Sequence, residues 1–85
     1  MREKVRVGII GLGYMGGIHL IKLKNVRHAV VSAVFDIDKS KYDRIKDKSV
    51  VKCNDYRELE NHVDAVVISS PSTTHYFYTK YFLSK

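Results

Sequence analysis

Short apolar runs alternate along this chain with segments in which apolar residues recur at helical spacing. The first run, residues 5–10, carries apolar residues on both faces, as a central strand of a parallel sheet does. Residues 30–35 form a second run with almost no alternation. Between the two runs, Met15, Ile18 and Ile21 fall on one face of a helix. This pattern predicts a strand, a helix and a second strand in succession.

The same alternation continues to the end of the chain. The predicted strands cover residues 5–10, 30–35, 49–53 and 64–69. The predicted helices cover residues 15–23, 39–46, 55–60 and 73–83. Strands that alternate with helices imply an α/β fold with a parallel sheet and right-handed crossovers. In a doubly wound dinucleotide-binding fold, the strand order is 3-2-1-4, with helices on both faces.

Composition limits the class of protein. The chain is 45% hydrophobic and 28% charged, which is typical of a globular domain, and its length allows one domain over residues 1–85. No stretch is apolar enough for a membrane span or a signal peptide, so we expect a cytoplasmic protein without membrane contacts. Cys53 is the single cysteine, which fits a reducing compartment. No Cys/His spacing predicts a metal site.

The net charge of +6 raises the alternative of a nucleic-acid-binding domain. The lysines are spread through the chain and form no single block, as the side chains of a binding stripe would. A solvated basic surface is therefore the favoured interpretation, and nucleic acid is an unlikely partner.

A glycine-rich turn follows the first predicted strand at the spacing G-x-G-x-x-G. Gly11 allows a tight turn, Gly13 has no side chain to keep a diphosphate from the main chain, and Gly16 lets the next helix pack closely. Unpaired amides and partial positive charge at a helix start favour an anion. A strand before this motif and a helix after it form the context in which it indicates dinucleotide binding.

An acidic residue stands where a ribose-binding carboxylate is expected. Asp36 follows the second predicted strand, 20 positions after Gly16. A carboxylate there accepts hydrogen bonds from ribose hydroxyls and repels a 2′-phosphate, which favours NAD over NADP. Lys39 and Lys41 lie close in sequence and weaken this preference slightly. The alternative is that Asp36 only caps the next helix, but its spacing and position favour the cofactor role.

A polar loop follows the fourth predicted strand. In the strand order 3-2-1-4, the fourth strand lies beside the first, so this loop opens onto the same crevice as the glycine turn. Pro71 would fix the loop, and its hydroxyls and His75 could reach the nicotinamide side of a cofactor. For His75 an ordinary surface position at a helix start is an equally weighted alternative.

The sequence resembles, over nearly all of its length, the N-terminal cofactor domain of the glucose–fructose oxidoreductase and inositol dehydrogenase family (Gfo/Idh/MocA). The resemblance rests on three segments, VRVGIIGLGYMGGIH, FDID and DAVVISSPSTTH. It implies a partial Rossmann-type fold in which the glycine turn holds the pyrophosphate, Asp36 the ribose and Ile37 the adenine. The cofactor-binding residues that it implies are Gly11, Leu12, Gly13, Tyr14, Met15, Gly16, Asp36, Ile37, Ser69, Ser70, Pro71 and His75.

Members of that family carry further elements. A fifth strand ending in Glu-Lys-Pro follows the last helix, and a substrate domain supplies the catalytic histidine or tyrosine. We therefore expect a truncated NAD-binding domain, without catalytic residues, of an enzyme that transfers hydride between NAD and a hydroxyl carbon of a sugar, cyclitol or related compound. Without a fifth strand, the edge of the strand at 64–69 or the helix at 73–83 is expected to mediate self-association.

Two other interpretations of the glycine turn stay open. One is a non-catalytic module that senses NAD. The other is the N-terminal domain of a homoserine or dihydrodipicolinate type reductase, which shares the glycine turn but usually not the S-P-x-x-x-H loop.

Overall fold

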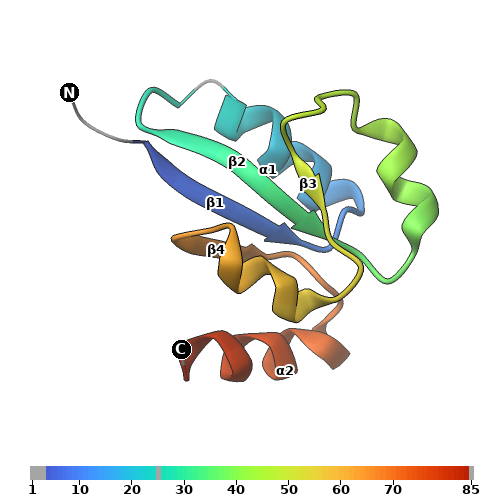
Figure 1. The fold of residues 1–85 in the computed structure, drawn as a ribbon. Coiled ribbons are helices and arrows are strands. Elements are labelled where there is room, and N and C mark those ends of the chain that lie inside the picture. The colour runs from blue at the N-terminus through green and yellow to red at the C-terminus, as the bar shows by residue number, and fades with distance from the viewer. Residues whose placement is uncertain (1–3, 25, 85) are drawn as a thin grey trace.

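The structure is a computed structural model that describes residues 4–24 and 26–84, apart from the side chains at positions 14, 15, 20, 21, 24 and 72. The strands are β1 (Val5–Ile10), β2 (Ala29–Phe35), β3 (Val51–Lys52) and β4 (Ala65–Ile68). They form one parallel sheet in the order β3-β2-β1-β4, which confirms the predicted order (Figure 1).

Helical segments follow the strands in turn. They are α1 (Tyr14–Lys24), the 3₁₀ helices η1 (Lys39–Arg44) and η2 (Tyr56–Asn61), and α2 (Ser72–Leu83). None of these described helices is long and apolar enough to cross a membrane.

The sheet is covered on both faces, as the largely apolar strands predict. On one face, Ile9 and Val34 are completely buried and pack in a cluster that Leu23 of α1 and Tyr42 of η1 complete. The opposite face carries the second core cluster, which includes residues of η2 and α2. Figure 1 shows η2 and α2 together on the side of the sheet away from α1. The doubly wound architecture follows from the burial of Val7–Ile10 in β1 and Ala33–Phe35 in β2, where residues on both faces of the sheet are covered.

One irregularity in β2 changes which face its residues occupy. Val7 and Gly8 of β1 pair with Val31 and Ala33, so Ser32 is an extra residue in the ladder. Such a bulge interrupts the two-residue alternation of a strand. As a result Val31 belongs to the same core cluster as Val34, although the two residues are three positions apart.

The expected helix at 39–46 is wrong in type and length. The structure has a 3₁₀ helix that ends at Arg44, and Ile45 after it is in extended conformation with only 6% of its surface exposed. Apart from Tyr42 the helix is polar, and no helical residue of it is buried. Packing of an apolar face supplies most helix stability in proteins, so the chain leaves the helix early and buries Ile45 instead.

The expected third strand at 49–53 is also too long. β3 covers only Val51–Lys52, because Ser49 donates from its amide and its hydroxyl to the carboxylate of Asp47 in a preceding turn. The remaining elements agree with the predicted ones to within a residue or two at each end, although η2, like η1, is a 3₁₀ helix.

The start of α1 packs against the turn that leaves β1. A Cβ atom at Gly16 would lie 1.8 Å from the carbonyl oxygen of Gly11, a distance that no real structure allows. At Gly17, the next residue of the same helix, a Cβ atom would meet nothing within 4 Å. The close contact between helix and turn therefore depends on glycine at one position and not at its neighbour.

We expect Gly16→Ala to lower the free energy of unfolding by at least about 2 kcal/mol, because the added methyl group forces α1 away from the turn. Gly17→Ala is the matched control, and it should raise stability by up to about 1 kcal/mol through helix propensity. Urea denaturation followed by circular dichroism measures both. Equal stability of the two variants would show that α1 does not pack on the turn as described.

Candidate functional site

The glycine turn, the end of β2 and the loop after β4 meet at one end of the sheet. The amide of Gly11 donates to the carbonyl of Phe35 (2.9 Å), and the amide of Ser69 donates to the carbonyl of Ile10 (2.7 Å). A cavity of about 50 Å³ lies where they meet. It is lined by Ile10, Gly11, Phe35, Asp36, Ile37, Ser70, Pro71, Thr74 and Tyr78. The structure thus brings together residues from all three segments that sequence analysis selects.

The glycine turn is tight at one point and open at another. Gly11 has φ of 92°, which L-residues rarely adopt, and a Cβ atom there would lie 2.8 Å from the main chain of Ser69 and Ser70. At Gly13 a Cβ atom would meet nothing within 4 Å. Gly13 precedes the first residue of α1, Tyr14, so the main chain is approachable at a helix N-terminus, where anions are favoured.

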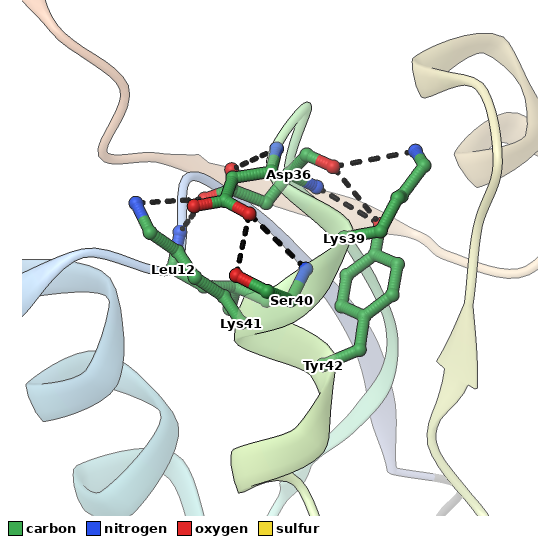
Figure 2. Close-up of polar contacts among 7 residues, drawn as sticks. Leu12, Asp36, Lys39, Ser40, Lys41 and Tyr42 are labelled. Atoms are coloured by element: carbon green, nitrogen blue, oxygen red, sulfur yellow. Dashed lines mark hydrogen bonds and ion pairs between the residues drawn. The ribbon is translucent and has the colours of Figure 1, made fainter.

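Asp36 is the buried charged residue of the site, with 7% of its surface exposed. One carboxylate oxygen, Oδ2, accepts a hydrogen bond from the amide of Leu12 (2.7 Å), and the other, Oδ1, accepts one from the amide of Asp38 (2.8 Å), as Figure 2 shows in part. Lys41 Nζ lies 3.7 Å from Oδ2. Each oxygen of a carboxylate has two acceptor positions, so both retain capacity for a ligand hydroxyl.

The alternative role of Asp36 as a helix cap is wrong. Asp38 is the N-cap of η1, since its Oδ1 accepts from the amide (3.1 Å) and the hydroxyl (2.6 Å) of Ser40. These bonds lower the pKa of Asp38, so its carboxylate is ionised at neutral pH. Asp36 instead links the end of β2 to the glycine turn.

Ser70 carries the one described buried side-chain oxygen that has no hydrogen-bond partner. It lines the cavity together with Gly11 and Asp36. A buried hydroxyl without a partner costs about 1–3 kcal/mol, and native proteins rarely leave one unsatisfied. Ser70 is therefore a residue of the cavity with unused hydrogen-bonding capacity.

Two side chains of η1 hold the main chain of Asp36, and sequence analysis missed their role. The hydroxyl of Tyr42 accepts from the amide of Asp36 (3.0 Å) and donates to the carbonyl of Cys53 (2.6 Å). Lys39 Nζ donates to the carbonyls of Asp36 (3.3 Å) and Asn54 (3.0 Å). We call Tyr42 and Lys39 the strand-end clamp, because they join β2 to the segment after β3.

Burial is the main cause that raises the pKa of Tyr42, so its phenol is neutral and keeps the proton that it donates. The only sequence signal for this clamp is that Tyr42 is the sole aromatic residue in the charged segment 39–46.

The remaining predicted site residues differ in how far they are exposed to solvent. Ile37 is 78% exposed at the mouth of the cavity, and Pro71 is exposed as well. Ser69 and Ser70 are half-buried, and the side chains of Tyr14 and Met15 lie outside the described residues.

His75 is exposed on the first turns of α2, where its Nδ1 lies 3.4 Å from the hydroxyl of Thr79. It lines a second, open cavity of about 430 Å³ together with Ser70, Tyr76 and Thr79. Ser70 lines both cavities, so His75 lies next to the Asp36 cavity and not inside it.

We expect Tyr42→Phe to lower the free energy of unfolding by about 1–3 kcal/mol, since the change removes the partner of the Asp36 amide and the donor to Cys53. Tyr76→Phe is the matched control, because Tyr76 is 72% exposed and loses only a surface hydroxyl. Its effect should stay within about 0.5 kcal/mol. If thermal or urea denaturation gives the same stability for both variants, the strand-end clamp does not stabilise the fold.

Comparison with known proteins places these features in a family. Residues 5–85 match the family GFO_IDH_MocA, described as an oxidoreductase family with an NAD-binding Rossmann fold. A curated relative, myo-inositol 2-dehydrogenase of Thermotoga maritima, is 36% identical over 75 residues, which cover 84% of this chain and 22% of the relative.

Solved structures of inositol dehydrogenases superpose on this chain, in agreement with the sequence matches. Apo scyllo-inositol dehydrogenase from Lactobacillus casei superposes with a TM-score of 0.75 at 30% identity, covering 88% of this chain and 24% of that one. The same enzyme with bound NAD(H) and scyllo-inositol superposes with a TM-score of 0.71 at 31% identity, covering 82% and 22%. The chain therefore spans less than a quarter of the length of these relatives.

Proposed function

Because the chain belongs to the Gfo/Idh/MocA oxidoreductase family and carries its NAD-binding Rossmann fold, we propose that NAD binds where β1, β2 and β4 end. The observation that carries the proposal is the bond from the Leu12 amide to the Asp36 carboxylate, which joins the glycine turn to the acidic residue at one cavity. The cofactor-binding residues that we propose are Gly11, Leu12, Gly13, Tyr14, Met15, Gly16, Asp36, Ile37, Ser69, Ser70, Pro71 and His75.

Three features of the described residues support a dinucleotide at this site. The open main chain at Gly13 and the start of α1 provide a place for the diphosphate. Asp36 has acceptor capacity for ribose hydroxyls, and the exposed side chain of Ile37 offers an apolar surface to adenine. The buried hydroxyl of Ser70, which has no partner among the described residues, supports the proposal as a further polar group beside the cavity.

We propose that the protein takes part in hydride transfer. In that reaction a hydroxyl-bearing carbon of a cyclitol or sugar loses hydride to the nicotinamide ring, its hydroxyl proton goes to a base, and the alcohol becomes a ketone. NAD supplies the hydride acceptor when bound, and this chain holds and orients it. The inositol dehydrogenases among its relatives support a cyclitol as the substrate class. We assign no catalytic residue to the described part of the chain.

A reducing, cytoplasmic location is the compartment that we propose. Cys53 is completely buried, and burial raises the pKa of its thiol to about 11. Such a thiol stays protonated and unreactive at neutral pH, so it acts as a small apolar core residue. A free thiol in this structural role fits a reducing compartment.

The cofactor site is tested by filling the open space at Gly13. Gly13→Val places a branched side chain where the diphosphate approaches, so we expect the dissociation constant for NADH to rise at least about 100-fold in a fluorescence titration. Gly17→Val is the matched control, because its Cβ atom is equally free of contacts but lies four positions further along the chain, within α1. The proposal is refuted if Gly13→Val binds NADH as tightly as the parent chain does.

We also propose that the chain self-associates through the outer edge of β4. Among the described residues, β4 pairs only with β1, and Ala65 on it is exposed. A groove of about 510 Å³ lies beside β4, between the end of η2 and α2. It is lined by Glu60, Val63, Asp64, Ala65, Val66, Ile68, Thr79, Phe82 and Leu83. Unpaired strand edges next to apolar side chains favour pairing with another chain.

Light scattering at tens of micromolar, roughly the range of weak protein contacts, should show dimers or larger species. Ala65→Lys should shift the chain toward monomer, because a charge on an edge strand opposes pairing. Val26→Lys adds the same charge at another exposed apolar position, in the loop before β2, and should leave the association unchanged. A strictly monomeric parent chain would contradict the proposal.

A further inference from the structure

The positive charge of the chain is distributed unevenly along the sequence. From position 4 to position 35 there is no Asp or Glu, whereas acidic residues recur from Asp36 to Asp64. The basic residues of the acid-free stretch are Lys4, Arg6, Lys22, Lys24 and Arg27. Most of the net charge of +6 therefore belongs to the part of the chain that forms β1, α1 and β2.

These residues belong to the end of the sheet that is opposite to the cofactor cavity. The amide of Val5 donates to the carbonyl of His28 (2.8 Å), which joins the start of β1 to the loop before β2. The amide of Val26 donates to the carbonyl of Leu23 (3.2 Å), which joins that loop to the last turn of α1. Figure 1 shows this junction at one end of β1 and the glycine turn at the other. The two are about 17 Å apart, the length of a six-residue strand.

The cations at this end are available to a ligand. Lys4, Lys22 and Arg27 are exposed and form no ion pair within the described part of the chain. The carboxylate of Asp64 also lies at this end, but it accepts bonds from the amide (2.9 Å) and the guanidinium (2.9 Å) of Arg6. Asp64 is therefore neutralised by Arg6 and leaves the other cations uncompensated.

Two valines with large exposed fractions accompany these cations. Val5 is 46% exposed and Val26 is 45% exposed. We call the surface formed by Lys4, Val5, Lys22, Val26 and Arg27 the basic end. Protein interfaces combine an apolar centre with a polar and charged rim, and the basic end has this composition.

We propose that the basic end binds an acidic segment of another protein, in which Asp or Glu residues are interspersed with apolar ones. Complementary charge attracts such a segment and orients it, and its apolar side chains cover the two valines. The surface lies away from the cofactor cavity, so this proposal goes beyond the proposed function and does not depend on it.

The same residues fit other polyanions less well. Single-stranded nucleic acid binds to basic grooves in which aromatic rings stack on the bases, and the basic end has no aromatic residue. Surfaces that bind anionic membranes insert large side chains such as Trp, Phe or Leu. The short valine side chains of a strand and a loop do not supply that anchor.

The test uses the whole chain and a fluorescein-labelled synthetic peptide of four Glu-Glu-Leu repeats, with binding followed by fluorescence anisotropy. At about 0.05 M salt we expect a dissociation constant of about 100 µM or below. The double variant Lys22→Gln/Arg27→Gln should weaken binding at least about fivefold. Lys46→Gln/Lys80→Gln is the matched control, since it removes the same charge from exposed positions elsewhere, and it should stay within about twofold of the parent.

Val26→Ser tests the apolar part of the surface and should weaken binding of the same peptide at least about twofold. Circular dichroism checks that each variant is folded. The proposal is overturned if the parent chain does not bind the peptide, or if the double variant and its control bind it equally. It is also overturned if oligothymidylate or vesicles of phosphatidylserine and phosphatidylcholine bind the parent more tightly than the peptide does. Loss of NADH binding by the parent chain would count against the cofactor site alone.

Discussion

A single buried carboxylate connects the parts of this site. Burying an ionised group costs several kcal/mol unless it is paired and hydrogen-bonded, and Asp36 receives bonds from two main-chain amides. One of those amides belongs to Leu12 in the glycine turn, and the other to Asp38 just beyond β2. The bonds that make the burial tolerable also fix the distance between the turn and the strand end. The diphosphate and the ribose of a dinucleotide lie at a fixed distance from each other. The main-chain bonds to Asp36 hold the glycine turn and the end of β2 at one spacing, as contacts to both groups require.

The strand-end clamp fixes the position of Asp36 beyond the end of the sheet. The ladder between β2 and β3 ends near Val34 and Cys53, whose main-chain bond is 2.9 Å long. Past that point Tyr42 and Lys39 hold the main chain of Asp36 with side-chain bonds. Binding groups work best when a second layer of contacts limits their movement, and here a polar 3₁₀ helix provides that layer. Although η1 has no buried residue, its side chains hold Asp36 in place and so contribute to the site.

Much of the fold and of the site follows from local signals. The strand order could be predicted because apolar strands with helical connections admit few topologies. Gly11 and Asp36 could be predicted as site residues because their spacing belongs to one motif. The role of Tyr42 could not be predicted, since its bond to Cys53 spans 11 positions and no local sequence pattern indicates it. The bulge at Ser32 and the early end of η1 both result from tertiary packing, which overrides the period of the sequence.

Two glycines of the turn, Gly16 and Gly13, are under different constraints, and the difference matters for the evolution of this fold. Gly16 touches the carbonyl of Gly11, so any descendant that still folds this way keeps it, whether or not it uses a nucleotide. A Cβ atom at Gly13 would meet nothing within 4 Å, so a larger residue there costs the fold little. Loss of a glycine at Gly13 alone would therefore mark the lineages in which the domain has become a purely architectural part.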